Sequence, residues 1–147
     1  MRRTIYVLAA LILTAMTSSL SFAEDSPIGV WRTYDDSDGQ AASLVQIEEK
    51  NGLIEGRIVK LLPRKGHDVN AVCDKCEGEN KNQPITGMKI LWNMKRDGDK
   101  YVGGEIFDPN SANTYRCKMH VVDGKLEVRG YLGVSLFGRS QTWLREQ

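Results

Sequence analysis

Hydrophobic and polar residues alternate with a period of two along most of the chain, and no long segment has the spacing of an amphipathic helix. In residues 113–122, for example, Cys117 and Met119 fall on one face and Lys118 and His120 on the other. Such alternation is typical of strands that bury one face and expose the other. The pattern predicts an antiparallel, all-β domain.

Turn signals join these runs into hairpins. Asn51-Gly52, Asp97-Gly98 and Asp123-Gly124 each separate two alternating runs, and glycine accepts the positive φ that tight hairpin turns require. The expected strands cover residues 28–34, 43–49, 53–61, 88–94, 101–107, 113–122, 125–133 and 139–145. About eight consecutive strands with one polar face predict a closed up-and-down barrel, because closure removes the exposed edges of an open sheet.

Two segments depart from the regular pattern. Pro63 to Gly87 is rich in Lys, Asn, Asp and Gly, and it predicts one long loop of a kind that is usually either functional or mobile. Gly103-Gly104 interrupts an expected strand. No helix follows it to present an N-terminus to a phosphate, so it predicts a bend or a close strand contact.

The N-terminus has the features of a secretory signal peptide. Arg2 and Arg3 are followed by an apolar run over residues 5–16 and by small residues up to Ala23. The run is shorter than the roughly 20 residues of a membrane-spanning helix. We expect residues 1–23 to be removed on export, with the periplasm favoured over secretion from the cell. Residues 24–147 then form a single domain.

Charge excludes some partners. Without Arg2 and Arg3 the chain keeps 18 basic and 19 acidic residues, a formal charge of −1. Scattered, balanced charges give no footprint for nucleic acid. The sequence also has no contiguous basic amphipathic stretch that would hold it to a membrane surface, so no stable membrane insertion is expected.

Three cysteines allow one disulfide and one remaining thiol. A Cys73–Cys76 bridge across the sequence "CDKC" is slightly favoured, with Cys117 as a small buried residue on a strand. The alternative joins Cys117 to either of the other two and closes a larger ring, worth about 3–4 kcal/mol. Redox catalysis is disfavoured because Asp74 and Glu77 would raise a thiol pKa, and no βαβ pattern surrounds the pair.

Zinc binding is a further alternative for the same cysteines. Cys73, Cys76 and Cys117 with His67 would form a Cys₃His set, whereas His120 alternates away from Cys117. In an oxidising compartment, disulfide formation competes with such a site. We therefore predict no metal and no cofactor.

The inward-facing positions are candidates for ligand binding. They either fill the barrel or line a pocket for one small, mainly apolar ligand, and the sequence leaves both possibilities open. The candidate ligand-binding residues are Ile90, Trp92, Tyr115, Met119, Val128 and Leu132, with Arg57 as a polar contact.

The two ends of the domain carry a short motif. Gly29-Val30-Trp31 opens the first expected strand and Trp143-Leu144-Arg145 closes the last. This resembles the Gly-x-Trp start and the late basic residue of lipocalins and fatty-acid-binding proteins. The resemblance implies that Arg145 covers Trp31 beside Gly29 and closes one end of the barrel, as a guanidinium stacks on an indole.

A wider resemblance covers almost the whole domain. The blocks "GVWRTYDDSDG", "CDKCEGENKNQPITGMKIL", "YVGGEIFDPNSANTYRCKM" and "LEVRGYLGVSLFGRSQTWLR" are similar to the exported bacterial family known as domain of unknown function 2147. The resemblance implies a lipocalin-like barrel but no function. "DPNSANTY" departs from the family's usual glycine-containing turn, which leaves the shape of that turn open.

These observations predict an exported binding protein for a small, mainly apolar ligand. The alternative is an envelope interaction or structural module with a filled barrel, whose loop 63–87 meets a protein partner. An enzyme or a zinc-binding protein ranks third. The sequence contains no Gly-x-Ser-x-Gly or His-Glu-x-x-His motif, and we predict no catalytic residues.

Overall fold

The computed structural model describes residues 25–147. The predicted signal peptide, residues 1–23, lies outside the described residues. Across residues 25–147 no helix has the length and the apolar character needed to cross a membrane.

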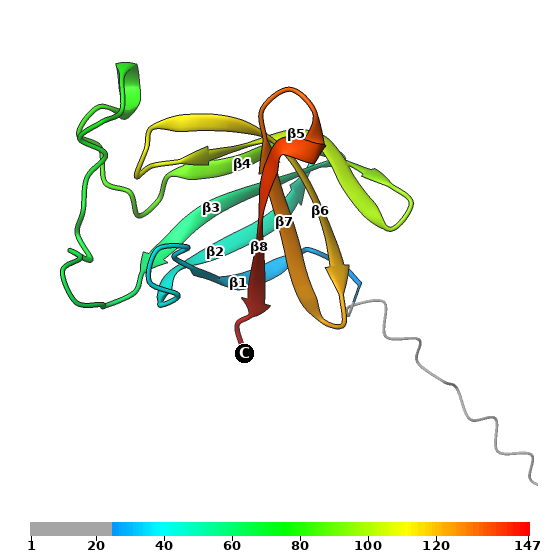
Figure 1. Ribbon diagram of the computed structural model, residues 1–147, viewed down its shortest axis with the longest axis horizontal. Coiled ribbons are helices and arrows are strands. Elements are labelled where there is room, and N and C mark those ends of the chain that lie inside the picture. The colour runs from blue at the N-terminus through cyan, green and yellow to red at the C-terminus, as the bar shows by residue number, and fades with distance from the viewer. Residues whose placement is uncertain (1–24) are drawn as a thin grey trace, which may run out of the picture.

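Eight antiparallel strands form one closed barrel in chain order (Figure 1). The ring closes where β8 pairs with β1, with Trp31 opposite Arg145. The strands are β1 (Gly29–Tyr34), β2 (Ala41–Lys50), β3 (Leu53–Leu61), β4 (Lys89–Asp97), β5 (Lys100–Asp108), β6 (Asn113–Val122), β7 (Lys125–Tyr131) and β8 (Gly138–Arg145). Two single-turn 3₁₀ helices, η1 (Gly78–Asn80) and η2 (Ser135–Phe137), lie in the connections. The predicted fold class is confirmed.

Tight hairpin turns occur where the sequence predicts them. Asn51 and Gly52 have φ values of 53° and 78°, and Asp123 and Gly124 have values of 51° and 70°. Two consecutive residues with positive φ give the turn whose twist matches that of the flanking strands. These turns fix the register of β2 against β3 and of β6 against β7, and with it the face that each side chain occupies.

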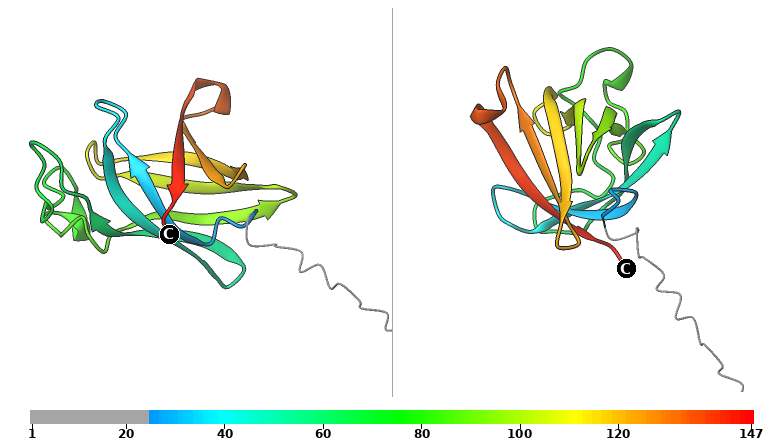
Figure 2. Two further views of the ribbon diagram at one scale, coloured as in Figure 1. Left: turned by 90° about the horizontal axis from the view of Figure 1, so that it is seen from below. Right: turned by 90° about the vertical axis from the view of Figure 1, so that its right-hand side faces the viewer.

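The up-and-down order separates two ends of the barrel. Short turns gather at the end where β1 starts and β8 finishes, which we call the floor. The longer connections gather at the opposite end, which we call the mouth (Figures 1 and 2). They are residues 35–40, 62–88, 109–112 and 132–137. Loops carried on a rigid barrel are common positions for binding residues.

The floor is closed as the end motif implied. The Arg145 guanidinium carbon lies 4.2 Å from the centre of the Trp31 ring. Arg145 also donates to the carbonyl oxygens of Ser26 and Ile28, at 2.7 and 2.9 Å. The Trp31 indole donates to the Pro27 carbonyl at 2.7 Å. These bonds tie the segment before β1 across the end of the barrel.

Side chains fill the interior above the floor. A side chain next to a space large enough for water would keep some surface accessible to water. The most deeply placed side chains keep none. Those with an exposed fraction of 0% are Trp31, Val45, Ile47, Leu91, Met94, Cys117 and Leu126, together with Cys73 of the long loop. At these levels the barrel is a packed core, one of the two possibilities that the sequence left open.

Two candidate residues do not face the interior as predicted. Trp92 pairs with Glu105 and donates to its carboxylate at 2.9 Å, on the outer face, while Leu91 and Met94 are fully buried. An irregular step at Asn93, whose φ is 58°, sets which residues of β4 point inward. Leu132 follows the end of β7 and is 66% exposed, because the strand ends one residue earlier. The predicted inward direction of both side chains is wrong.

Candidate functional site at the barrel mouth

The long connection between β3 and β4 is held against the mouth. Arg64 reaches the loop between β1 and β2, where it pairs with Asp35 at 2.8 Å and with Asp38 at 3.2 Å. On the other side, Lys75 Nζ donates to the Asn110 carbonyl oxygen at 2.9 Å, in the turn between β5 and β6. The loop therefore bridges two other connections of the mouth and has a defined position.

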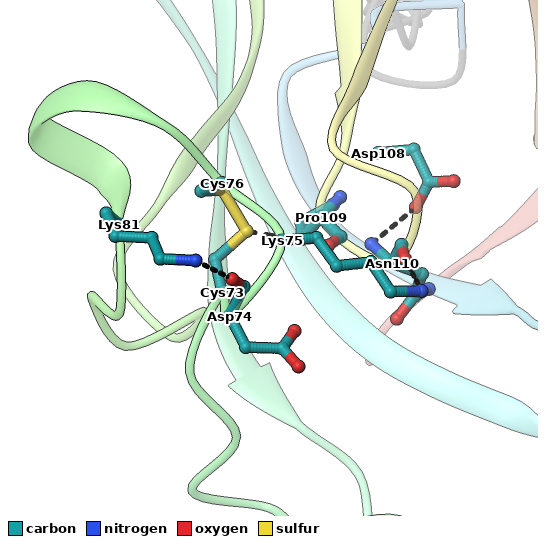
Figure 3. The surroundings of a disulfide bond; sticks show 8 residues. All are labelled: Cys73, Asp74, Lys75, Cys76, Lys81, Asp108, Pro109 and Asn110. Atoms are coloured by element: carbon teal, nitrogen blue, oxygen red, sulfur yellow. Dashed lines mark hydrogen bonds between the residues drawn. A yellow bond between two sulfur atoms is a disulfide. The ribbon is translucent and has the colours of Figure 1, made fainter.

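A disulfide joins Cys73 to Cys76 within this loop, which confirms the favoured pairing (Figure 3). Both cysteines are buried, and Cys73 Sγ lies 3.5 Å from the Pro109 carbonyl oxygen. Lys81 donates to the carbonyl of Asp74 inside the same ring. The bridge fixes a compact corner of the loop beside the turn that joins β5 to β6.

Cys117 is a free, fully buried thiol on the inner face of β6. Burial raises its pKa to about 12, because the thiolate would lose its hydration. A thiol in this state is neither a nucleophile nor a metal ligand at neutral pH.

We expect the three cysteines to differ sharply in alkylation. Iodoacetamide at pH 8 should add nothing to the native protein, since Cys117 is buried and the other two are bonded. In denaturant without reductant, intact-mass measurement should find one adduct, and in denaturant after reduction three. Rapid native labelling of Cys117 would contradict the packed interior.

The zinc alternative is not supported by the geometry. Two of its four proposed ligands, Cys73 and Cys76, are bonded to each other and carry no thiolate. Over residues 25–147, no three His, Cys, Asp or Glu side chains come close enough to hold a metal ion. His67 lies near the start of the loop, where its backbone pairs with Arg64.

Asp35 organises the loop between β1 and β2. Its carboxylate accepts hydrogen bonds from the Ser37 hydroxyl and from the Ser37 backbone N–H, the latter at 2.8 Å. These bonds, and then the Arg64 guanidinium, lower the pKa of Asp35 from 3.8 to about 2. Hydrogen bonds to a carboxylate favour its charged form.

The tethering of the loops should therefore weaken in acid. A carboxyl with a depressed folded-state pKa stabilises the fold above its unfolded pKa, and this contribution is lost as the pH falls from about 4 to about 2. In a pH titration of the side-chain carbon by NMR, Ser37→Ala should raise the pKa of Asp35. Ser140→Ala, on β8 and without a bond to Asp35, should leave it unchanged. An unchanged titration in Ser37→Ala would contradict this cause.

A hollow of about 380 Å³ lies between the disulfide corner and the turn from β5 to β6. Phe107, Ala112 and Cys76 give it apolar surface. Polar groups come from both sides of the gap, and they are Lys75, Glu77, Asn80 and Ser111. The hollow is shallow and open to solvent, so a ligand in it would be only partly enclosed. We call this hollow the mouth cleft.

A second hollow, of about 200 Å³, lies over β2, β3 and the start of β4. Its lining includes four charged residues, and two of them, Lys89 and Glu55, form an ion pair at 2.7 Å. The Lys89 ammonium lowers the pKa of the Glu55 carboxyl, as expected for an ion pair. The predicted ligand residue Arg57 also lines this hollow, which is smaller than the mouth cleft.

Hydrogen-bonded side chains also run along β8 to the mouth. The Trp143 indole donates to Gln141 at 3.0 Å, Gln141 donates to Asp36 at 2.9 Å, and Arg139 pairs with Asp36 at 3.3 Å. Thr33 of β1 and Ser43 of β2, which are paired in the sheet, share a buried 2.7 Å hydrogen bond. The upper part of the interior is thus more polar than the packed levels below it.

The predicted ligand residues lie apart from one another. Ile90, Met119 and Val128 are buried in the core, and Tyr115 is half-buried opposite Ile106. Arg57 is an exposed residue of β3 that donates to the Gly87 carbonyl oxygen at 2.6 Å. The structure does not gather them around one opening.

Sequence reasoning missed the walls of the mouth cleft. Phe107 is on the outer side of β5, a position that alternation assigns to solvent, and the long loop covers it. The one signal in the sequence was the Cys73–Cys76 pair, because a loop held compact by a disulfide is expected to pack against the rest of the domain. Of the residues that line the cleft, Lys75 is the one that lies between the two bonded cysteines in the sequence.

Comparison with known proteins supports the fold. The sequence profile of the family described as "Uncharacterized protein conserved in bacteria (DUF2147)" matches residues 29–145. The solved structure of protein HP1028 from the human pathogen Helicobacter pylori, described as belonging to the lipocalin family, is similar with a TM-score of 0.71 and 19% identity. The match covers 83% of this chain and 84% of that one, and at this identity it shows the fold alone. No curated protein sequence matches significantly.

Proposed function

Because the chain belongs to the DUF2147 family of bacterial proteins and folds as a lipocalin-like barrel, we propose that it is an exported protein that binds a small ligand in the mouth cleft. The observation that carries this proposal is the cleft itself, a hollow of about 380 Å³ whose walls a disulfide holds in place. A site with fixed walls loses little conformational entropy when a ligand binds.

A ligand in the interior would fit this structure less well. Leu91, Met94 and Leu126 in the interior keep no accessible surface. A ligand there would have to displace packed side chains, and cores resist added volume. The mouth cleft needs no such displacement.

The cleft walls indicate the chemistry of the ligand. Phe107 and the Cys76 sulfur present apolar surface, which suits a short apolar or aromatic group. Lys75 contributes a cation, of which one hydrogen is already donated to Asn110. A polar or anionic group next to the apolar part would satisfy the remaining hydrogens. We therefore expect a small amphipathic ligand whose polar groups meet the larger part of the cleft wall and whose apolar part contacts Phe107.

Export fits the same picture. The disulfide is of a kind that persists in oxidising compartments, and a signal-like segment precedes the domain in the sequence. Intact-mass measurement of the protein recovered from the periplasm should give a chain that begins at Glu24 with two hydrogens fewer than the reduced form. A chain that retains residues 1–23 would contradict export by cleavage.

Binding can be tested with a defined probe, 8-anilino-1-naphthalenesulfonate, which is aromatic and anionic. Titration of the chain from residue 24, followed by fluorescence and by amide NMR shifts, should move the signals of residues 74–80 and 107–112. Phe107→Ala should weaken the dissociation constant about tenfold, through loss of an aromatic contact. Leu144→Ala shortens an exposed leucine near the floor, outside the mouth, and should have no effect.

The charge of the cleft has its own matched pair of variants. Lys75→Gln should weaken sulfonate binding severalfold, while Lys65→Gln, in the same loop but outside the cleft, should not. If neither Phe107→Ala nor Lys75→Gln changed the dissociation constant of the probe, the proposal would be overturned. If such a result accompanied a protein partner captured through loop 63–87, it would favour the rival function, an interaction module.

A further inference from the structure

The loop between β7 and β8 exposes a cluster of large apolar side chains. In the described chain, other large hydrophobics that reach solvent are scattered and 38–44% exposed. The four in this loop, within six consecutive positions, are 60–78% exposed: Leu132, Val134, Leu136 and Phe137. Contiguous exposed apolar side chains of this kind usually mark an interaction site. We call these four residues the apolar tip.

The apolar tip stands out from the barrel. Figures 1 and 2 show this loop projecting past the neighbouring strand ends at the mouth. Its backbone is nevertheless anchored, because Arg129 donates to the carbonyl oxygens of Ser135 at 2.7 Å and of Leu136 at 3.1 Å. Lys118 adds a bond to the Ser135 hydroxyl at 3.2 Å. The side chains are therefore displayed by a braced loop.

Cations lie directly behind the tip. Lys118 of β6 is paired with Arg129 of β7 in the sheet, and both side chains lie on the outer face. Arg116 precedes them by one outward position on β6, opposite Tyr131. Strand pairing thus gathers three basic side chains from two strands next to an apolar loop. We call these three residues the basic patch. Two carboxylates share the same outer face, Glu105 opposite Arg116 and Glu127 two positions before Arg129.

An apolar tip with cations one layer behind it matches the profile of a lipid surface. Apolar side chains enter the boundary between headgroups and acyl chains, and basic side chains remain at the level of the phosphates. The loop that carries the tip projects from the barrel (Figures 1 and 2). A fluid bilayer accepts a projecting tip without a complementary shape. We infer that the apolar tip and the basic patch form a docking surface for an anionic phospholipid membrane.

We expect membrane binding through this surface to be reversible. Four side chains and three cations are far fewer contacts than those of a spanning segment, and the electrostatic part is screened by salt. The mouth of the barrel, with its cleft, would face the membrane while the protein is docked.

Vesicle flotation tests the inference directly. All eight strands of the barrel lie within residues 25–147, so the protein used is the chain from residue 24. The vesicles contain phosphatidylcholine and phosphatidylglycerol at 3:1. The wild type should float with these vesicles and bind about tenfold more weakly to phosphatidylcholine alone. Raising the salt from about 0.05 to 0.5 M should remove most of that preference.

Variants separate the two parts of the surface. Leu136→Ser with Phe137→Ser should weaken binding about 100-fold, roughly tenfold for each inserted side chain. Leu144→Ser, at an exposed leucine near the floor, should change it less than about twofold. Arg116→Glu should weaken binding to the anionic vesicles but not to phosphatidylcholine. Because the replaced side chains are exposed, thermal unfolding should show all variants folded.

Two outcomes would overturn the inference. One is a wild type that does not float with anionic vesicles at low salt. The other is binding that Leu136→Ser with Phe137→Ser leaves unchanged. Light scattering could instead find a wild-type dimer that becomes monomeric in this double variant. In that case the tip would be a dimer interface and the membrane assignment would fail.

Discussion

Replacing Trp31 with alanine should lower the free energy of unfolding by about 4 kcal/mol, because the side chain is fully buried and removing a buried Trp costs about 3–5 kcal/mol. The change also removes the indole N–H that binds Pro27 and the ring under Arg145. With a total stability of about 5–15 kcal/mol for a typical domain, the variant should be close to unfolding at 37 °C. Urea denaturation followed by circular dichroism measures the change.

Trp92→Ala is the matched control. This tryptophan lies on the outer face of the same barrel, half-buried, with its indole bonded to Glu105. We expect a loss of about 1 kcal/mol, as is usual for a partly exposed side chain. If the two substitutions cost the same, the floor would not be closed as described.

Gly104→Ala should destabilise the barrel by about 3 kcal/mol or more. A Cβ atom at this position would lie under 3.0 Å from Met94 Sδ and from the backbone carbonyl oxygen of Trp92. The carbonyl belongs to the neighbouring strand and cannot move without separating β4 from β5. Overpacking a filled core costs about 1–3 kcal/mol, and a contact with backbone puts this case at the upper end. Thermal and urea unfolding give the value.

Gly130→Ala provides the comparison at another inward-facing glycine. The nearest atoms to its Cβ would belong to Ile106 and Tyr115 at 3.5 Å, an ordinary van der Waals distance. The change should therefore lie within about 0.5 kcal/mol of the wild type. If Gly130→Ala strongly lowered the free energy of unfolding while Gly104→Ala left it unchanged, the packing described around the two glycines would be wrong.

These two sites show that the interior is filled at two levels of the barrel. Trp31 fills the barrel from the floor, and Met94 packs against Gly104 in the middle of the sheet. With both levels filled, the barrel serves as a scaffold for the connections at its mouth. The mouth cleft and the apolar tip both lie there, on connections that a packed core keeps in position.

Local sequence determined the strands and their order. A period of two is a property of each strand alone, and the positive φ of Asn51-Gly52 and Asp123-Gly124 is decided within each turn. The same holds for the bridge of Cys73 and Cys76, whose three-residue separation keeps the two sulfurs near each other whatever the rest of the chain does. The resemblance of the end motif to lipocalins added the stacking of Arg145 on Trp31 at one end of the barrel.

The tertiary structure alone decided how full the barrel is and where its surfaces lie. Filling depends on the summed volumes of side chains from eight strands, and no single strand carries that information. The irregular step at Asn93 turned Trp92 outward, and the end of β7 released Leu132 to solvent. No contiguous stretch is basic and amphipathic. Strand pairing nonetheless places Lys118 beside Arg129 and behind an apolar loop, because a sheet joins residues that are distant in the chain.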